Sequence, residues 1–167
     1  MAHDTIEYIS SDGRFGVKVS SQIIMHVRKI CSKSCFLETG GLLIGHYTDD
    51  LKWAVITEAT TPPSGSKRTP TSFVRNGDAA LFHLDRAWKK KAYYLGEWHF
   101  HPNSSSNPST TDKNTIRMLA NSKNLHCLEP IMYIIGGNTD NWNEYIAVYS
   151  NKGLIVLHRL LTKAASY

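Results

Sequence analysis

Cysteine is scarce in this 167-residue sequence, and long apolar runs are absent from it. Its three cysteines are too few, and odd in number, for a disulfide framework, which is typical of a protein of the reducing cytosol. No apolar run approaches the ~18 residues that a membrane-spanning helix needs. Residues 1–4 show neither the basic nor the apolar region of a secretory leader. We therefore expect a cytoplasmic protein without a membrane partner.

Negative charge is also in deficit, because 19 Lys and Arg residues stand against 14 Asp and Glu residues, a net charge of +5. The densest basic run is Lys89–Lys91, at the end of a predicted helix, where cations complement the helix dipole. We interpret this run as a solvated helix end rather than a nucleic-acid patch, and expect no nucleic-acid partner. The net charge favours an acidic protein partner through electrostatic steering.

The rest of the composition, 41% hydrophobic and 20% charged residues, is that of a globular protein with a core of its own. The sequence shows no internal repeat and no sign of a second domain, so we expect one domain over residues 1–167. Predicted strands span residues 5–9, 15–19, 40–47, 51–57, 92–101, 130–135, 144–150 and 154–160. Predicted helices begin at Ser20 or Ser21, at Asp78 and at Ser109. This order of elements predicts an α/β fold, a mixed sheet flanked by helices.

Two of these segments carry specific expectations. The helix from Asp78 through Lys90 should bury an apolar stripe, which consists of Ala80, Leu81, Leu84, Ala87 and Trp88. The segment Thr60–Ser72 is rich in Thr, Pro, Ser and Gly, so it should form an exposed loop.

The stretch around His99 and His101 holds the strongest sign of chemistry. Side chains alternate along a strand, so both imidazoles should point the same way, with Cα atoms about 6.6 Å apart. Pro102 ends the strand, a loop follows, and Ser109 then caps a helix with Asp112 in its first turn. Two nitrogens and one oxygen leave a fourth tetrahedral position open, the arrangement of catalytic zinc. Each part also has an ordinary interpretation, because strand histidines are often structural and Ser-x-x-Asp is a helix-capping pattern.

His-x-His-Pro followed by Ser-x-x-Asp resembles the signature of the JAMM (MPN+) metalloproteases. The distant Glu of that family is matched by Glu38, which opens a Glu-x-Gly-Gly element. The resemblance implies one Zn²⁺ per chain, held by His99, His101 and Asp112. It further implies that Glu38 acts on the attacking water and that Ser109 assists the tetrahedral intermediate. It also implies the MPN (JAB) fold, in agreement with the predicted mixed sheet.

The wider match over residues 96–102 is similar to the small bacterial JAB peptidases of anti-phage (CBASS) operons, the CD-NTase-associated group. Members of that group reverse a ubiquitin-like conjugation made by a linked E1/E2-type enzyme. The resemblance therefore implies hydrolysis of the bond between a ubiquitin-like or CD-NTase C-terminal tail and a protein target. Related peptidases carry substrate-gripping insertions between the Glu element and the His strand, which makes Thr60–Ser72 the first candidate for such a role.

Three alternatives stay open. One is a peptidase of another bacterial ubiquitin-like pathway, with the same chemistry. A second is a DNA-repair-associated JAMM relative, which is disfavoured because Asn103-Ser104 follows the histidine motif where those relatives have Ser-Gly. The third is a non-catalytic MPN scaffold, which typically loses metal ligands that this sequence keeps. The motifs of zinc deaminases are missing from the sequence.

Two further features have no assigned role. Glu97 shares strand parity with the two histidines, so it either orients a ligand or is a charge at the start of the strand. A second metal site is conceivable from three cysteines and a histidine, which are Cys31, Cys35, Cys127 and His126. No Cys-x-x-Cys pair supports that site, so buried reduced thiols are the expectation.

Overall fold

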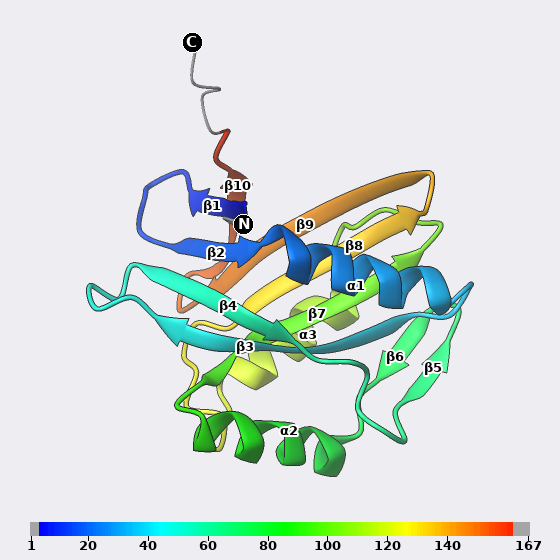
Figure 1. Ribbon diagram of the computed structural model, residues 1–167, viewed down its shortest axis with the longest axis horizontal. Helices are drawn as coiled ribbons and strands as arrows, with labels where there is room; N and C mark the ends of the chain where they lie inside the picture. The colour runs from blue at the N-terminus through cyan, green and yellow to red at the C-terminus, as the bar shows by residue number, and fades with distance from the viewer. Residues whose placement is uncertain (1–3, 162–167) are drawn as a thin grey trace.

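Ten strands and three helices make up the fold in the computed structural model, which describes residues 4–161 (Figure 1). The strands are β1 (Thr5–Ser10), β2 (Gly16–Ser20), β3 (Thr39–Tyr47), β4 (Trp53–Ala59), β5 (Lys67–Thr69), β6 (Ser72–Val74), β7 (Tyr93–Pro102), β8 (Ile131–Asn138), β9 (Asn141–Ser150) and β10 (Gly153–Arg159). The helices are α1 (Ser21–Lys33), α2 (Gly77–Lys89) and α3 (Thr110–Ala120). Over the described range 4–161, no helix is both long and apolar enough to cross a membrane.

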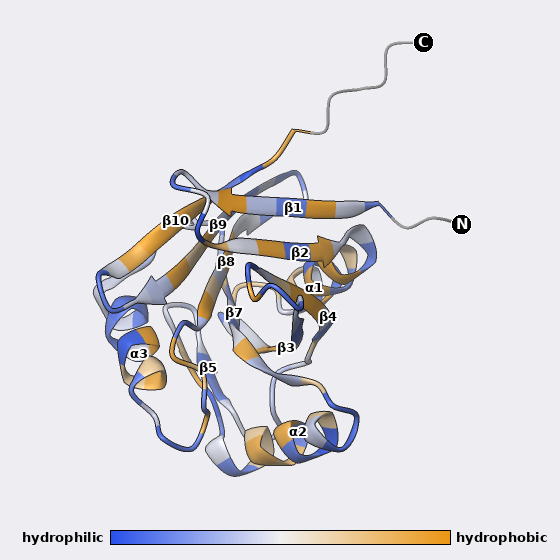
Figure 2. Ribbon diagram, turned by 90° about the vertical axis from the view of Figure 1, so that its left-hand side faces the viewer, coloured by the Kyte–Doolittle hydropathy of each residue, from blue (hydrophilic) through white to orange (hydrophobic). Residues whose placement is uncertain are grey.

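Eight of the strands close into a barrel in the order β1-β10-β9-β8-β7-β3-β4-β2. Most neighbours are antiparallel, but β2 pairs with β4, and β7 with β8, in parallel. The predicted mixed α/β sheet is thus confirmed. Its closure was not predicted, and it arises because β1 pairs with both β2 and β10. The alternation that predicts β1 is visible as hydrophobic and hydrophilic bands along that strand (Figure 2).

The core lies on both sides of β3, because successive residues of a strand face opposite ways. Leu43 joins the large cluster shared with α1, whereas Leu42 and Ile44 join the cluster under α2. The two helices accordingly lie on opposite sides of β3 (Figure 1). A third cluster forms where Ile116 of α3 packs on β8. The barrel therefore fixes all three helices through apolar burial, the dominant favourable contribution to folding.

Each helix begins at a side chain that accepts a free amide hydrogen of the first turn. Ser20 caps α1 and Ser109 caps α3, as predicted. The prediction that Asp78 caps α2 is wrong, because Asn76 accepts from the Ala79 amide instead. Asp78 lies in the first turn of α2, where its negative charge complements the helix dipole.

The buried stripe of α2 is narrower than predicted. Ala80 and Ala87 are buried and Leu84 packs beside them, whereas Leu81 and Trp88 are 58% and 68% exposed. The two alanines at the contact let the helix lie close to β3 and β7. The larger side chains that flank this contact therefore stay on the outer surface.

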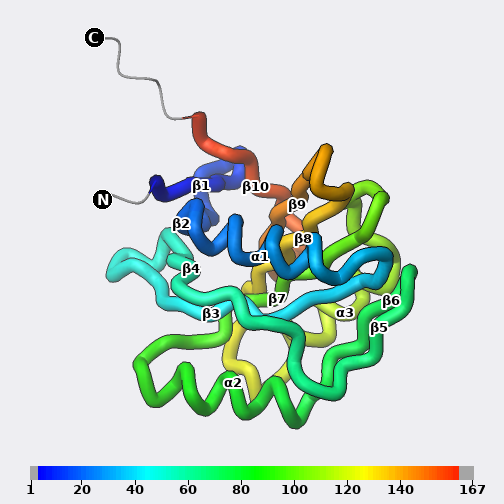
Figure 3. Tube along the Cα trace, turned by 45° about the vertical axis from the view of Figure 1, so that its right-hand side comes forward, coloured from blue at the N-terminus to red at the C-terminus, as the bar shows by residue number. Residues whose placement is uncertain are grey.

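The segment Thr60–Ser72 is not a loop throughout, because β5 forms within it and pairs with β6. Three cross-strand pairs join the two strands, from Lys67 opposite Val74 to Thr69 opposite Ser72. This β5–β6 hairpin lies beside the connection from α1 to β3 (Figure 3). The prediction of a loop was wrong here because strands of three residues are too short to show an alternating pattern.

β7 lies between β3, to which it is antiparallel, and β8, to which it is parallel. Its Gly96 has a φ of +150°, and a Cβ there would lie 2.0 Å from the carbonyl oxygen of Ile131 in β8. Directly opposite Gly96, the register between β7 and β3 shifts between Leu43 and Ile44 of β3. Glycine thus permits a local irregularity and a close strand contact just before the histidine pair.

Gly96→Ala should lower the free energy of unfolding by about 1–3 kcal/mol, because the added methyl group overlaps the backbone of β8. Gly77→Ala is the matched control, since a Cβ at the first residue of α2 meets nothing within 4 Å. Urea unfolding of both variants measures the difference. Wild-type stability of Gly96→Ala would contradict the tight contact.

Candidate active site

A cleft of about 880 Å³ opens between α3 and the β5–β6 hairpin. Residues 70–75 form the wall on the hairpin side, and residues of α3 between 111 and 119 form the opposite wall. Glu97 of β7 and Met132 and Ile134 of β8 lie between the two walls. The segment after β7, with Ser104 and Ser105, closes the end that carries the histidines.

Alternation along β7 places the histidines in this cleft. His99 and His101 both line it, whereas Phe100 between them is 2% exposed and belongs to the core. Trp98 is also in the core, 1% exposed, with its indole N–H donating to the carbonyl of Thr60 at 3.0 Å. The prediction that both imidazoles point to the same side of the strand is confirmed.

Asp112 reaches both histidines from the first turn of α3. Its Oδ1 lies 3.0 Å from Nδ1 of His99, and its Oδ2 lies 3.5 Å from Nε2 of His101. Ser109 and Asp112 also form a reciprocal capping box, in which Oδ2 accepts from the Ser109 amide and hydroxyl, both at 2.7 Å. The helix cap therefore holds the carboxylate at the end of β7.

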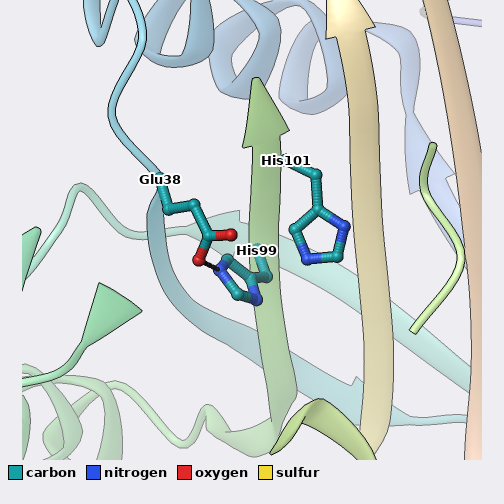
Figure 4. A group of neighbouring side chains, drawn as sticks. All are labelled: Glu38, His99 and His101. Carbon is teal, nitrogen blue, oxygen red and sulfur yellow. Dashed lines mark hydrogen bonds and ion pairs between the residues drawn. The ribbon is translucent and has the colours of Figure 1, made fainter. Parts of the chain in front are cut away.

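Glu38 completes the group from the residue that precedes β3. Its Oε2 lies 2.9 Å from Nε2 of His99 (Figure 4). Ligand atoms of Glu38, His99 and His101 all lie within 4.8 Å of one another. Together with Asp112 and Ser109, the structure thus brings all five predicted site residues to one end of the cleft.

The two glycines at the start of β3 are explained by their neighbours. A Cβ on Gly40 would lie 2.8 Å from the ring of Phe73, and a Cβ on Gly41 would lie 2.6 Å from Nε1 of Trp98. The Phe73 ring also lies 5.9 Å from the His99 ring, measured between centroids. Gly40 thus makes room for the hairpin to pack beside the site, and Gly41 makes room for the buried indole.

The electrostatics of the site favour a positive charge beside His99, whose two ring nitrogens both face carboxylates. Burial opposes protonation, but hydrogen bonds to Asp112 and Glu38 outweigh it and raise the pKa of His99 to about 9. Burial also opposes ionisation of Asp112, yet its contacts with the His101 ring, the His99 ring and the Ser109 hydroxyl hold its pKa well below its usual range. The surroundings that stabilise an imidazolium at this position also suit a metal cation.

The donor set fits zinc, which takes imidazole nitrogens and carboxylate oxygens. Nδ1 of His101 lies 3.0 Å from the carbonyl oxygen of Ser105. A carbonyl only accepts, so Nδ1 carries the proton, and in the neutral ring Nε2 then has a free lone pair. Within residues 4–161, Glu38, His99 and His101 form the one group of three such side chains whose ligand atoms converge closely enough for a metal. Asp112, the third ligand that the resemblance implies, lies against both histidines but is not part of that group.

Sequence reasoning missed the residues that join the hairpin to β7. Glu97 faces the cleft, as its parity predicts, and forms an ion pair with Arg75 at 3.0 Å. The hydroxyl of Tyr94 donates to the same carboxylate at 3.4 Å. Glu97 therefore anchors the wall of the cleft. The only early sign of this was an acidic residue on the functional face of a predicted strand.

The cysteines do not gather into a second site. Cys31 is buried in the cluster shared with α1, and Cys127 is buried under α2, on the other side of β3. The expectation of buried thiols is confirmed for these two and is wrong for Cys35, which is exposed in the turn after α1. Burial raises the pKa of Cys127 to about 11, as expected for an unreactive thiol.

A helix-covered mixed barrel with a Glu, two His and an Asp at one end of a cleft defines the JAB (MPN) class of domain. In agreement, the family model described as prokaryotic homologs of the JAB domain matches residues 20–147. The chain therefore belongs to the prokaryotic JAB family.

Relatives support this assignment. Over 153 residues the chain is 38% identical to a "CD-NTase/cGAS isopeptidase" of Enterobacter hormaechei subsp. hoffmannii (strain UCI 50), covering 92% of this chain and 85% of that protein. Over 154 residues it is 29% identical to a "Probable metalloprotease y4qB" of Sinorhizobium fredii (strain NBRC 101917 / NGR234), covering 89% of this chain and 93% of that protein. The solution structure of protein DSY2949 from Desulfitobacterium hafniense has the same fold, with a TM-score of 0.65 and 17% sequence identity. The match covers 83% of this chain and 87% of that protein.

Ser109→Ala should cost about 1 kcal/mol of stability, because the Asp112 amide loses its capping acceptor. Ser20→Ala removes the equivalent cap of α1 and should cost a similar amount, but it does not touch the cleft. Thermal unfolding of both variants tests this. A loss confined to Ser20→Ala would mean that the capping box does not hold α3.

Proposed function

We propose that this chain is a zinc-dependent isopeptidase of the cytoplasm. It removes a ubiquitin-like or CD-NTase C-terminal tail from a protein target in an anti-phage (CBASS) system. The observation that carries the proposal is the convergence of Glu38 with the two histidines and Asp112 at one end of an open cleft. The substrate class is supported by the name of the 38% identical relative, "CD-NTase/cGAS isopeptidase".

His99, His101 and Asp112 would hold one Zn²⁺ and leave a coordination position open, as in catalytic zinc sites. When bound, Zn²⁺ supplies Lewis acidity, which polarises a carbonyl and lowers the pKa of water toward ~7. The protein contributes ligand orientation. The capping box fixes Asp112, and the carbonyl of Ser105 fixes the tautomer of His101.

Glu38 is the proposed general base and then general acid. Its carboxylate already lies beside His99, so it can take the proton of the attacking water and deliver it to the departing amine. The Ser109 hydroxyl donates to Asp112 in this structure, but it also lines the cleft. Turned toward the substrate, it would donate to the developing oxyanion, which is worth roughly 3 kcal/mol when well placed.

The hairpin offers a place for an extended tail. Strand β6 pairs with β5 along one of its two edges, and the three residues of β6, Ser72–Val74, line the cleft. The outer edge of β5 is already covered, since Thr69 accepts from the Glu38 amide. A tail that adds a strand to β6 would receive main-chain hydrogen bonds and lead its last residues toward the histidines.

Two alternatives predict different results in the experiments below. A non-catalytic scaffold would cut nothing even when loaded with metal. A peptidase of another ubiquitin-like pathway would bind zinc and cut a tail other than that of a CD-NTase. The sequence retains His99, His101, Asp112 and Glu38, which favours catalysis over a scaffold.

His101→Ala should remove most of the zinc, because it deletes one of three protein ligands. Metal analysis of purified protein should find about one zinc per chain in the wild type. His46→Ala is the control, since His46 is an exposed residue at the other end of β3. Equal zinc in wild type and His101→Ala would remove His101 from the site.

A reporter fused to the C-terminal tail of the CD-NTase of the proposed CBASS system should be cut at the tail junction. Recognition should lie on the acyl side of the bond, where an extended tail is held by its backbone and read through alternate side chains. A scrambled tail should survive. Glu38→Gln should lower turnover by about 10²–10⁴-fold while keeping zinc, because the amide cannot accept the water proton.

Mass spectrometry of the products locates the cut. Equal cleavage of both tails, or cleavage of neither by the zinc-loaded protein, would overturn the substrate assignment. More than about a tenth of wild-type turnover in Glu38→Gln would contradict the general-base role.

A further inference from the structure

We propose that Arg68 is a positioning residue that holds Glu38 in place from the β5–β6 hairpin. The inference rests on the proposed function, in which Glu38 is the general base. Arg68 itself does not line the cleft. It acts on the main chain of Glu38, and so links the wall of the cleft to the residue that moves the proton.

The barrel does not hold the main chain of Glu38. The first residue of β3 that pairs with β7 is Thr39, opposite Phe100. On the other side of Glu38 is an exposed turn, in which Phe36 is 72% exposed and Leu37 is 38% exposed. Glu38 therefore lies between a solvated turn and the start of a strand ladder, where backbone position is poorly constrained.

The β5–β6 hairpin supplies the main-chain hydrogen bonds that Glu38 does not receive from the β3–β7 ladder. The Glu38 amide donates to the carbonyl of Thr69 at 2.9 Å. The Glu38 carbonyl accepts from Nε of Arg68, also at 2.9 Å. Both main-chain polar groups of Glu38 are thus bonded to neighbouring residues of β5. Of the two bonds, the one from Arg68 depends on a side chain and is open to mutation.

Arg68 is well placed to act as a fixed anchor. It pairs across the hairpin with Phe73, whose ring packs over Gly40 and beside His99. The guanidinium therefore lies where the hairpin meets the start of β3.

The Arg68 guanidinium is not fully satisfied. Its Nη2 is buried and has no hydrogen-bond partner in the part of the chain that the structure describes. A buried donor without a partner is destabilising, so stability alone gives little reason for Arg at this position. Placement of the Glu38 carbonyl gives a reason, because a displacement of about 1 Å at a reacting group can cost about 100-fold in rate.

The test compares Arg68→Met, Arg68→Lys and Arg159→Met with the wild-type protein. Met keeps the length of the side chain but cannot donate, whereas Lys can still reach the same carbonyl. Arg159 is an exposed arginine at the end of β10 and does not line the cleft, so Arg159→Met is the matched control. The measurements are kcat and KM on the tail fusion, zinc content, and exchange of the Glu38 amide by NMR.

Arg68→Met should lower kcat about 10- to 100-fold, with KM and zinc content close to wild type. Arg68→Lys should restore part of that loss, and Arg159→Met should leave kcat unchanged. The Glu38 amide should exchange faster in Arg68→Met, because its bond to Thr69 opens more often. An unchanged kcat in Arg68→Met, an equal loss in Arg159→Met, or an unchanged rate of Glu38 exchange would overturn the proposal.

The amide measurement separates this proposal from the proposed function. If the wild type cuts no tail, the substrate assignment fails, and exchange alone decides whether Arg68 holds Glu38. If Arg68→Met does not fold, the exchange rate in Arg68→Ala, which also cannot donate, decides in its place. Faster exchange confined to Glu38 then supports the anchor, and wild-type exchange rejects it.

Discussion

The register of β7 against β3 and β8 determines which surface of the barrel can carry chemistry. Side chains alternate with a period of two, so a slip of one residue would turn both histidines into the core and Phe100 into the cleft. The register is favoured by burial on one face and by a close contact with β8. The core face holds Trp98 and Phe100, and Gly96 permits the close approach of β8 that a side chain there would block. Glu38 lies one residue before the ladder with β7 begins, so the same register brings it to His99.

Within that frame the site depends on a balance of charge. Two carboxylates face the His99 ring, and burial makes this costly unless a positive charge lies between them. The Asp112 carboxylate also serves α3, since one of its oxygens accepts the capping bonds of Ser109 while the other faces His99. Structural and proposed functional roles therefore coincide at Asp112. The helix cap orients the carboxylate in advance, which reduces the entropy lost when a ligand binds.

The sequence alone was sufficient for the strands with alternating patterns, for two of the three helix caps, and for the convergence of the five site residues. These predictions succeeded because they rest on local periodicity or on a specific motif. The sequence was insufficient where contacts between residues far apart in the chain determine the structure. The closure of the barrel depends on β1 meeting β10, and the exposure of Trp88 depends on how closely α2 approaches β3. The β5–β6 hairpin has strands of three residues each, and its contacts to Glu38, His99 and Glu97 have no signal in composition or spacing.

That hairpin has two tasks whose requirements differ. As the proposed wall for a tail it has to fit a particular substrate, whereas as the support for Glu38 it has to stay in one place. Alternation along β6 separates these tasks. Phe73 faces the barrel and is confined by Gly40 and His99, while Ser72 and Val74 face the other way, and Val74 is 58% exposed. If a tail pairs with β6 as proposed, its sequence is read by Ser72 and Val74. These positions can change with the substrate, while in the same proposal Arg68 and Phe73 keep the proposed general base Glu38 and His99 in position.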